Sequence, residues 1–201
     1  MAEDFLKENY GKNKMILYKY KDYDDYVAAQ THANVKKIDL VWVRKQTVET
    51  ICSYVPGAKM VLCHGTRNGR EQQYFKTFLP KAEVIGTEIS HTAKQFPMTV
   101  QHDFQKPKEE WINKCDIVYS NSFDHASEPT NCLNTWKNQI STNGRLYIEF
   151  AFAAGHNNSR RSDPLQVSEN ELIELCTDVG LIEDNFFMGN EMSSKVFSFR
   201  K

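Results

Sequence analysis

The chain lacks several features that define whole classes of protein. It has five cysteines but no pair at CxxC spacing, so a reduced cytoplasmic protein fits better than a disulfide framework. No apolar stretch approaches the roughly 18 residues of a membrane span, and we expect no membrane partner. The formal net charge of −1 lacks the basic excess that nucleic-acid binding requires, so we expect no nucleic-acid partner. The oligomeric state is not indicated.

Several catalytic motifs are also missing. The six histidines show no H-x-x-x-H or clustered Cys/His spacing, so we predict no metal site. The serine hydrolase motif G-x-S-x-G is absent. Neither GxxxxGK[ST] nor G-x-G-x-x-G occurs, which makes a phosphate-gripping loop a poor interpretation of the glycines that are present.

Alternating strand and helix patterns run through the second half of the chain. Strands are predicted at 60–63, 84–87, 98–101, 116–120 and 145–150, with helices at 70–79, 90–96, 108–113 and 129–140, and a turn or helix stop at 142–144. A helix with an S-x-x-E capping box follows from Ser168, and strands at 181–188 and 195–199 form a hairpin. We therefore predict an α/β fold: a Rossmann-like doubly wound sheet, mostly parallel with a C-terminal antiparallel hairpin.

The first part of the chain has a different character. Residues 1–21 are charged and tyrosine-rich without a clear period, and helices are predicted at 22–34 and 44–54, the second ended by Pro56-Gly57. With 201 residues, the chain fits one well-buried domain with an extension. We predict an N-terminal helical extension over 1–57, packed on a domain formed by 58–201. A long polar connection at 151–167 is of a length that is often functional.

The segment KMVLCHGTRNGREQ, residues 59–72, is the first candidate for function. It predicts a strand, a glycine turn and the start of a helix, where bare backbone N–H groups can hold a polar cofactor group. Gly65 can adopt a positive φ, and the missing Cβ of Gly69 lets a ligand approach closely. A plain strand-to-helix turn that binds nothing is the alternative.

Acidic residues follow the next two strands, at the edge where a parallel sheet places its ligand crevice. Glu88 is placed to accept hydrogen bonds from a ribose diol, and a solvated strand end is its alternative. Asp103 can accept from an exocyclic amine while Phe104 covers a purine ring. A turn aspartate before a core phenylalanine is nearly as good an interpretation of that pair.

Polar residues also follow the fourth predicted strand. His125 is a candidate general base, with Asp124 to orient it, although a surface or helix-capping histidine is more common. His64 lies within the glycine turn, where a packed histidine is the simpler interpretation. Arg160-Arg161 suits an anionic group, but a solvated charge pair is the default.

The order of these motifs resembles that of class I S-adenosylmethionine-dependent methyltransferases of the small-molecule type. VLCHGTRNG, VIGTEIS, HDF, DIVYSNSFDHASEP and GRLYIE carry the resemblance over about residues 59–201. It implies S-adenosylmethionine as cofactor: the glycine loop would contact the methionine part, Glu88 the ribose, and Asp103 the adenine amine. The implied cofactor-binding residues are Cys63, His64, Gly65, Thr66, Arg67, Gly69, Glu88, Ile89, Asp103, Phe104, Asn121 and Ser122.

The glycine loop departs from the pattern of that family. Cys63 stands where the family has an acid, and Arg67 replaces the middle glycine, so the loop HGTRNG is a variant. The resemblance predicts a methyltransferase that acts on a small molecule, with a sugar or sugar-linked compound as the suggested acceptor, by in-line displacement of the methyl group. Two alternatives stay open: a non-catalytic cofactor-binding or scaffold module, and a nicotinamide-dependent oxidoreductase.

Overall fold

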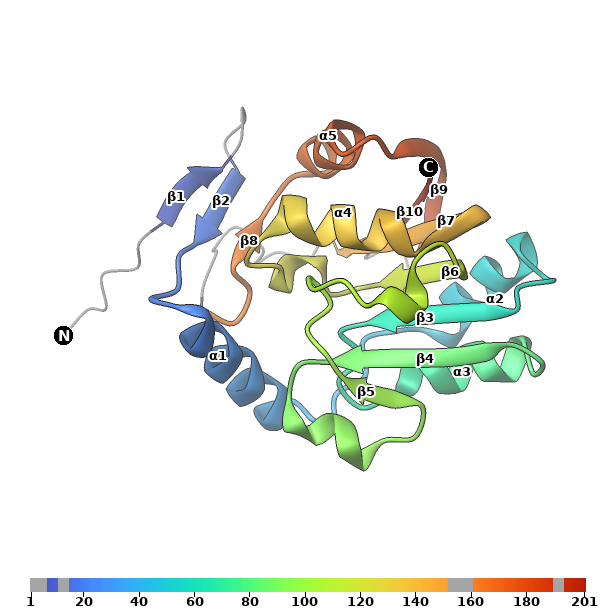
Figure 1. The fold of residues 1–201 in the computed structure, drawn as a ribbon, viewed down its shortest axis with the longest axis horizontal. Helices are drawn as coiled ribbons and strands as arrows, with labels where there is room; N and C mark the ends of the chain where they lie inside the picture. The colour runs from blue at the N-terminus through green and yellow to red at the C-terminus, as the bar shows by residue number, and fades with distance from the viewer. Residues whose placement is uncertain (1–6, 11–14, 152–160, 190–193) are drawn as a thin grey trace.

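The computed structural model describes residues 7–10, 15–151, 161–189 and 194–201. A seven-stranded sheet forms its centre, with the strand order β5-β4-β3-β6-β7-β10-β9 (Figure 1). The first five strands in this order pair in parallel, whereas β10 pairs antiparallel to both β7 and β9. The predicted sheet, mostly parallel and finished by an antiparallel hairpin, is confirmed.

Six of the seven strands begin and end within one residue of the predicted positions, whereas β7 begins five residues earlier than predicted. Short apolar runs such as Val61 to Cys63 are buried on both faces, as expected of parallel strands covered by helices. The bounds are β3 (Met60–His64), β4 (Glu83–Glu88), β5 (Thr99–Gln101), β6 (Cys115–Ser120), β7 (Ile140–Ala151), β9 (Ile182–Met188) and β10 (Ser194–Arg200).

Helices cover both faces of the sheet. On one face, α4 (Pro129–Gln139) and α5 (Glu169–Asp178) bury Trp136 and Leu172 in one hydrophobic cluster. On the other, α2 (Lys45–Tyr54) and α3 (Arg70–Phe78) bury Ile51 and Phe75 in a second cluster. Short 3-10 helices complete the connections: η1 (His91–Gln95), η2 (Glu109–Trp111) and η3 (Phe123–His125).

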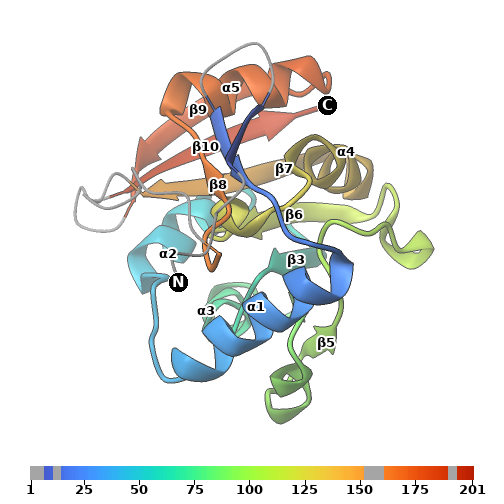
Figure 2. The ribbon, with the colours of Figure 1, turned by 90° about the vertical axis from the view of Figure 1, so that its left-hand side faces the viewer.

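The helix α1 (Tyr23–Lys36) lies across the edge of the sheet at which β3, β4 and β6 end (Figures 1 and 2). Its N-cap is Asp22, whose side chain accepts from the Asp25 backbone N–H at 2.9 Å. The helix has almost no amphipathic character, because the surface it covers is polar as well as apolar. This position makes α1 one wall of the cleft described below.

The two helices predicted in the N-terminal extension are confirmed, and two strands for which the sequence shows no pattern precede them. β1 (Lys7–Tyr10) and β2 (Met15–Tyr18) pair antiparallel, and β2 also pairs with β8 (Leu165–Gln166). The partner of β2 lies in the 151–167 connection, which was predicted to be polar and irregular. Such pairing depends on a partner far along the chain, and strands this short have little periodicity of their own.

The turn or helix stop predicted at 142–144 was wrong. β7 begins at Ile140 and runs through Gly144 without interruption, with a register shift opposite Cys115 and Ile117 of β6. A Cβ at Gly144 would lie 2.4 Å from the backbone oxygen of Cys115. The glycine therefore permits a close approach of two strands at a bulge.

The predicted capping box of α5 is confirmed, with Glu171 reaching back to the Ser168 backbone N–H at 2.6 Å. Gly180 follows the helix with a φ of +80°. The loop between β9 and β10 at 190–193 and the sequon at 157–159 lie outside the described residues. Among the described residues, no helix is both long and apolar enough to cross a bilayer.

The division at residue 57 remains a prediction. Side chains from both sides of it share each hydrophobic cluster: Met15 packs with the α4 and α5 face, and Val43 packs with the α2 and α3 face. Residues 1–57 and 58–201 therefore bury side chains in common cores.

Candidate functional site

A cleft lies where α1 crosses the carboxyl ends of β3, β4 and β6. It is open to solvent and is lined by both polar and apolar side chains. Residues from α1 form one side and the strand ends form the other. The lining residues are Tyr26, Gln30, Ala33, Asn34, Lys37, Gly65, Arg67, Glu88, Ile89, Asp103, Phe104, Ser122 and His125.

The glycine turn forms the floor of this cleft. Gly65 has a φ of +71° and its backbone N–H donates to Thr87, while a Cβ there would lie 2.6 Å from the Cβ of Ser122. The Ser122 hydroxyl donates to the Gly65 carbonyl at 3.1 Å. Glycine is needed at this position both for its φ and for the close approach of the loop after β6.

Arg67 adopts a left-handed conformation with a φ of +42°. Its backbone N–H donates to Glu88 Oε2 at 3.0 Å, and its guanidinium donates to the Leu40 carbonyl at 3.2 Å. Burial lowers the pKa of Arg67, and the charges of Glu71 and Glu88 partly offset this effect. The variant loop therefore places a cation at the rim of the cleft and ties it to the segment after α1.

Glu88 ends β4 and is 7% exposed. Its Oε1 accepts from the Ser90 backbone N–H and its Oε2 from that of Arg67, both at 3.0 Å. Burial raises the pKa of Glu88, and these backbone hydrogen bonds oppose the rise. A carboxylate can accept about four hydrogen bonds, so the two oxygens keep capacity for a ligand in the cleft.

Asp103 and Phe104 lie together at the same cleft. Asp103 Oδ2 accepts from the Tyr23 hydroxyl at 3.0 Å, and Oδ1 accepts from the Gln105 backbone N–H at 3.0 Å. Phe104 is 7% exposed and packs edge-on against Trp136. A carboxylate beside an apolar ring is a suitable neighbour for a flat, amine-bearing heterocycle.

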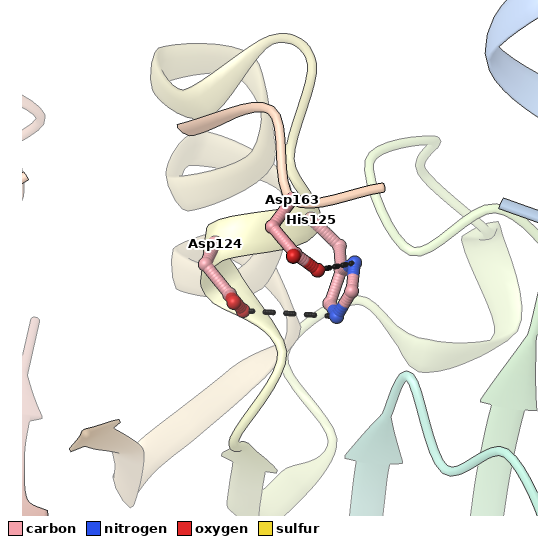
Figure 3. A group of neighbouring side chains, drawn as sticks. All are labelled: Asp124, His125 and Asp163. Atoms are coloured by element: carbon pink, nitrogen blue, oxygen red, sulfur yellow. Dashed lines mark ion pairs between the residues drawn. The ribbon is translucent and has the colours of Figure 1, made fainter. Parts of the chain in front are cut away.

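His125, in η3, also lines the cleft, and one of its ring nitrogens has a hydrogen-bond partner. Its Nδ1 is 2.7 Å from the Ser162 carbonyl, and a carbonyl can only accept, so Nδ1 carries a proton. Nε2 is 3.9 Å from Asp124 Oδ1, and Nδ1 is 3.7 Å from Asp163 Oδ1 (Figure 3). This arrangement leaves the Nε2 lone pair available as a base and would stabilise the imidazolium.

Asp124, His125 and Asp163 offer ligand atoms within 4.8 Å of one another, as a metal site requires. The two carboxylates face different nitrogens of the ring, however, as Figure 3 shows. Because Nδ1–H is held by Ser162, a metal would find only Nε2 and Asp124 on one side. The three side chains are therefore better arranged for proton transfer at the imidazole than for binding a metal ion.

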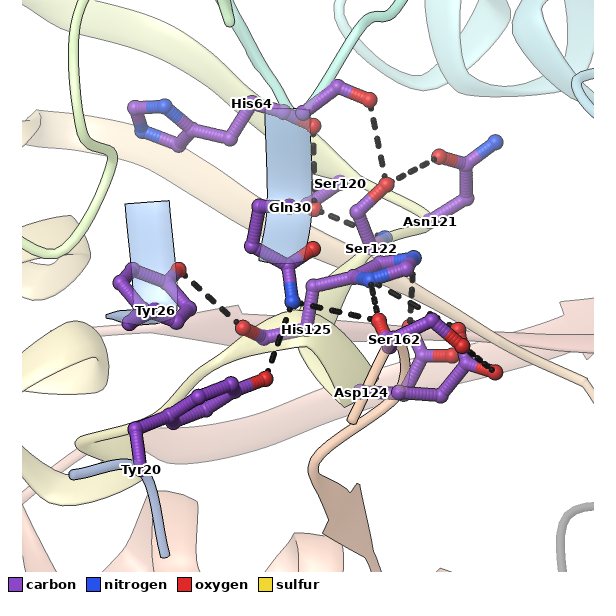
Figure 4. A network of polar contacts seen from close by, with 12 residues as sticks. Tyr20, Tyr26, Gln30, His64, Ser120, Asn121, Ser122, Asp124, His125 and Ser162 are labelled. Atoms are coloured by element: carbon purple, nitrogen blue, oxygen red, sulfur yellow. Dashed lines mark hydrogen bonds and ion pairs between the residues drawn. The ribbon is translucent and has the colours of Figure 1, made fainter. Parts of the chain in front are cut away.

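A polar network holds the segment that carries Ser162 (Figure 4). The Gln30 amide donates to the Ser162 carbonyl and to the Tyr20 hydroxyl, each at 3.2 Å. The Tyr20 hydroxyl donates to the Arg161 carbonyl at 2.6 Å, and Tyr26 donates to the His125 carbonyl at 3.2 Å. Side chains before and within α1 therefore hold His125 and its partner segment 161–162 in place.

Five residues of the predicted cofactor set do not line the cleft, and one of them, Asn121, lines the neighbouring hollow described below. Cys63 is fully buried between the sheet and α2, and His64 stacks on Trp136 at 5.1 Å, with Thr87 and Gln139 bonded to its ring. Burial lowers the pKa of His64 to about 3, so its ring is neutral and packed. Thr66 and Gly69 belong to the glycine turn but contact α3 and not the cleft: the Thr66 hydroxyl accepts from the Gln72 amide, and Gly69 is the N-cap of α3.

Arg161 does not offer its charge to the cleft. Its guanidinium pairs with Asp25 of α1. Arg160, the other member of the predicted pair, lies outside the described residues.

Glu71, in the first turn of α3, is a buried acid that sequence reasoning missed. It is 7% exposed, and its Oε2 has no hydrogen-bond partner among the described residues. Burial raises the pKa of Glu71 to about 7, against the opposing charge of Arg67 and a hydrogen bond from Asn121. An acid in the first turn of a helix normally indicates a solvated cap, so nothing in the local sequence marks it as buried.

We expect Glu71→Gln to stabilise the protein above neutral pH. The folded pKa of about 7 exceeds the ordinary 4.5, so stability due to the protonated carboxyl is lost as pH rises through 7. The variant should gain up to about 3 kcal/mol in unfolding free energy at pH 8 and little at pH 4. Urea unfolding at both pH values checks this, with Glu49→Gln at an exposed site of α2 as control. Equal gains at the two pH values would contradict it.

The α1 residues of the cleft were also missed. Tyr26, Gln30 and Asn34 are buried polar or aromatic side chains at positions i, i+4 and i+8 of α1. Their shared face was visible in the sequence, but its polar composition gave no hydrophobic stripe to identify it.

Comparisons with known proteins found similarity in structure alone. No family model and no curated protein sequence matches the chain. The Burkholderia thailandensis 1,6-didemethyltoxoflavin-N1-methyltransferase, solved with 1,6-didemethyltoxoflavin and S-adenosylhomocysteine, is similar with a TM-score of 0.71 and 15% identity, over 97% of this chain and 98% of that one.

Two further solved structures agree. A TehB-like S-adenosylmethionine-dependent methyltransferase from Corynebacterium glutamicum has a TM-score of 0.61 and 19% identity, over 89% of this chain and 98% of that one. The Synechocystis magnesium protoporphyrin IX methyltransferase with S-adenosylhomocysteine has a TM-score of 0.59 and 16% identity, over 89% and 100%. Together with the strand order, these similarities show that the chain has the fold of the class I S-adenosylmethionine-dependent methyltransferases.

Proposed function

We propose that the chain is a methyltransferase that uses S-adenosylmethionine as cofactor and acts on a small molecule. The observation that carries this proposal is the cleft at the carboxyl ends of β3, β4 and β6, where Glu88 and the Asp103-Phe104 pair meet. The solved structures of the same fold that contain S-adenosylhomocysteine support it.

The residues of the cleft fit the cofactor. Glu88 keeps free acceptor capacity for ribose hydroxyls, and Asp103 with Phe104 suits the adenine amine and ring. Asn34 faces Glu88, but its Nδ2 finds no partner with hydrogen-bond geometry among the described residues, which leaves a buried donor for a ligand oxygen. Gly65 keeps the floor open where any larger residue would meet Ser122.

The bound cofactor supplies a methyl group on a sulfonium, and the acceptor's lone pair bonds to that carbon as the carbon–sulfur bond breaks towards sulfur. The chain's own work is to align the reactants and to remove a proton from the acceptor. His125 Nε2 takes that proton, with Nδ1–H held on Ser162. Asp124, beside Nε2, stabilises the imidazolium that results.

The first experiment is calorimetry with three ligands. We expect S-adenosylmethionine and S-adenosylhomocysteine to bind and NAD not to bind, because the glycine turn lacks G-x-G-x-x-G and gives no built site for a pyrophosphate. Binding of NAD with no response to either sulfur nucleoside would overturn the proposal and favour an oxidoreductase.

A non-catalytic module that binds the cofactor is the second candidate. The variant loop favours it, because Arg67 holds the rim of the cleft through Leu40. Incubation with labelled S-adenosylmethionine and a metabolite extract distinguishes the two: a labelled methyl product supports the enzyme, whereas binding without any product supports the module. A sugar or sugar-linked acceptor stays a prediction that no observation of the site favours.

A further inference from the structure

A second hollow lies on the other side of the loop that follows β6, next to the cleft. Two aromatic rings and four aliphatic side chains give it apolar walls, and Gln166 adds an amide: the apolar residues are Phe123, Ile148, Phe150, Ala151, Leu165 and Val167. Asn121 and Asp124 line this hollow, whereas their neighbours Ser122 and His125 line the cleft. The loop 121–125 thus contributes side chains to both spaces.

Asp124 connects the hollow to the proposed base. Its side chain is 29% exposed, and its Oδ1 is 3.9 Å from His125 Nε2. The ring nitrogen with the free lone pair therefore faces the carboxylate that lines the hollow (Figure 3). A compound in the hollow that contacts Asp124 would therefore lie near this ring nitrogen.

The charge of the hollow has one sign. Besides Asp124 it is lined by Glu149, which is 8% exposed and accepts at 2.6 Å from the hydroxyls of Tyr119 and Ser194. Neither hydroxyl supplies a positive charge, and burial together with the Glu149 carboxylate raises the pKa of Tyr119. Within the part of the chain that the structure describes, no Lys, Arg or His lines the hollow.

This lining disfavours an anionic acceptor on physical grounds. An anion would meet the carboxylates of Asp124 and Glu149, and like charges close together repel. A flat ring with an amine fits both features of the hollow. Its faces can pack against the rings of Phe123 and Phe150, and its nitrogen can pair with the Asp124 carboxylate.

We propose that this hollow is the acceptor site and that it takes an apolar ring compound bearing an amine, which is neutral or positively charged. The inference rests on the proposed methyltransferase function and names its substrate class. A positively charged amine first loses a proton to His125 Nε2, because a protonated nitrogen has no lone pair. In the transfer, the lone pair of the neutral amine forms the bond to the methyl carbon and the carbon–sulfur pair goes to sulfur. An acceptor that binds in the neutral form loses its nitrogen proton to His125 Nε2 as this bond forms.

Three probes with the same indole ring and ethylene linker but a different terminal charge test the acceptor class: tryptamine, tryptophol and indole-3-propionate. Binding to the protein saturated with S-adenosylhomocysteine is measured by calorimetry or ligand-observed NMR. We expect tryptamine to bind at least tenfold more tightly than indole-3-propionate, with tryptophol between them. Equal or tighter binding of the propionate would overturn the inference.

Variants locate the effect in the hollow. Asp124→Asn removes one carboxylate and should reduce the tryptamine preference several-fold. Val167→Lys adds a cation to the lining and should reverse it, whereas the control Ile182→Lys, at an exposed position of β9, should leave it unchanged. Unchanged ratios in both test variants would place the probes elsewhere and overturn the inference.

The cofactor measurement separates this inference from the function on which it rests. If S-adenosylhomocysteine binds and the probes show no charge preference, the acceptor class fails alone. If S-adenosylhomocysteine does not bind, the proposed function itself fails. Its affinity in each variant also checks that the variant is folded.

Discussion

His125→Ala should lower the rate of methyl transfer by about 10²–10⁴-fold while cofactor affinity changes little, because general base catalysis typically contributes that factor. The Ser162 carbonyl holds Nδ1–H, so Nε2 is the ring atom that can receive the acceptor's proton. Single-turnover rates check the first result, and calorimetry with S-adenosylhomocysteine checks the second.

His32→Ala is the matched control, since His32 is exposed on α1 and lines neither the cleft nor the hollow. The test requires an acceptor that carries a proton to be removed. A variant with the wild-type rate would leave His125 as a structural residue between Ser162 and Tyr26. Alignment of the reactants would then be the whole mechanism.

Glu88→Gln should weaken binding of S-adenosylhomocysteine by at least tenfold. A hydrogen bond to a charged group contributes about 1.5–3 kcal/mol, and the neutral amide replaces one acceptor oxygen with a donor. Part of the loss would arise inside the protein, because Glu88 also holds the backbone N–H groups of Arg67 and Ser90. Calorimetry measures the total effect.

A ligand without ribose hydroxyls isolates the direct contact. The wild-type protein should bind the 2′,3′-dideoxy analogue of S-adenosylhomocysteine more weakly than it binds S-adenosylhomocysteine itself. In Glu88→Gln the two ligands should bind with nearly equal affinity, since the two changes remove the same interaction. Glu83→Gln is the control at the exposed other end of β4. Additive losses would mean that Glu88 supports the loop and does not touch the ribose.

The central sheet was predictable because its signals are local. Each strand is a short apolar run that ends at a glycine, an acid or a serine, and the helices between them have apolar stripes. The same regularity placed Glu88, Asp103 and Ser122 at one edge, because parallel strands separated by helices all end on the same side. Seven of the predicted cofactor residues line the cleft: Gly65, Arg67, Glu88, Ile89, Asp103, Phe104 and Ser122.

The rest of the site depends on contacts between distant segments. Ser162 fixes the His125 ring from 37 residues away, and Tyr23 reaches Asp103 across 80. Glu71 resembles a helix-cap acid in sequence, and only the packing of α3 against the sheet buries it. No periodicity within a window of 11–18 residues carries such information.

The pairing of β2 with β8 has a consequence for the order of folding. The hydrogen bond from Tyr20 to Arg161 spans 141 residues, so the loop it closes is among the longest in the chain. Contacts of such separation form late, because their closure entropy must be met before they contribute. The strands β3 to β6 can assemble from neighbouring segments. The contacts that hold Ser162 beside the His125 ring form only after the segment around Tyr20 has met the segment around Arg161. Refolding would therefore complete the two halves of the site at different times.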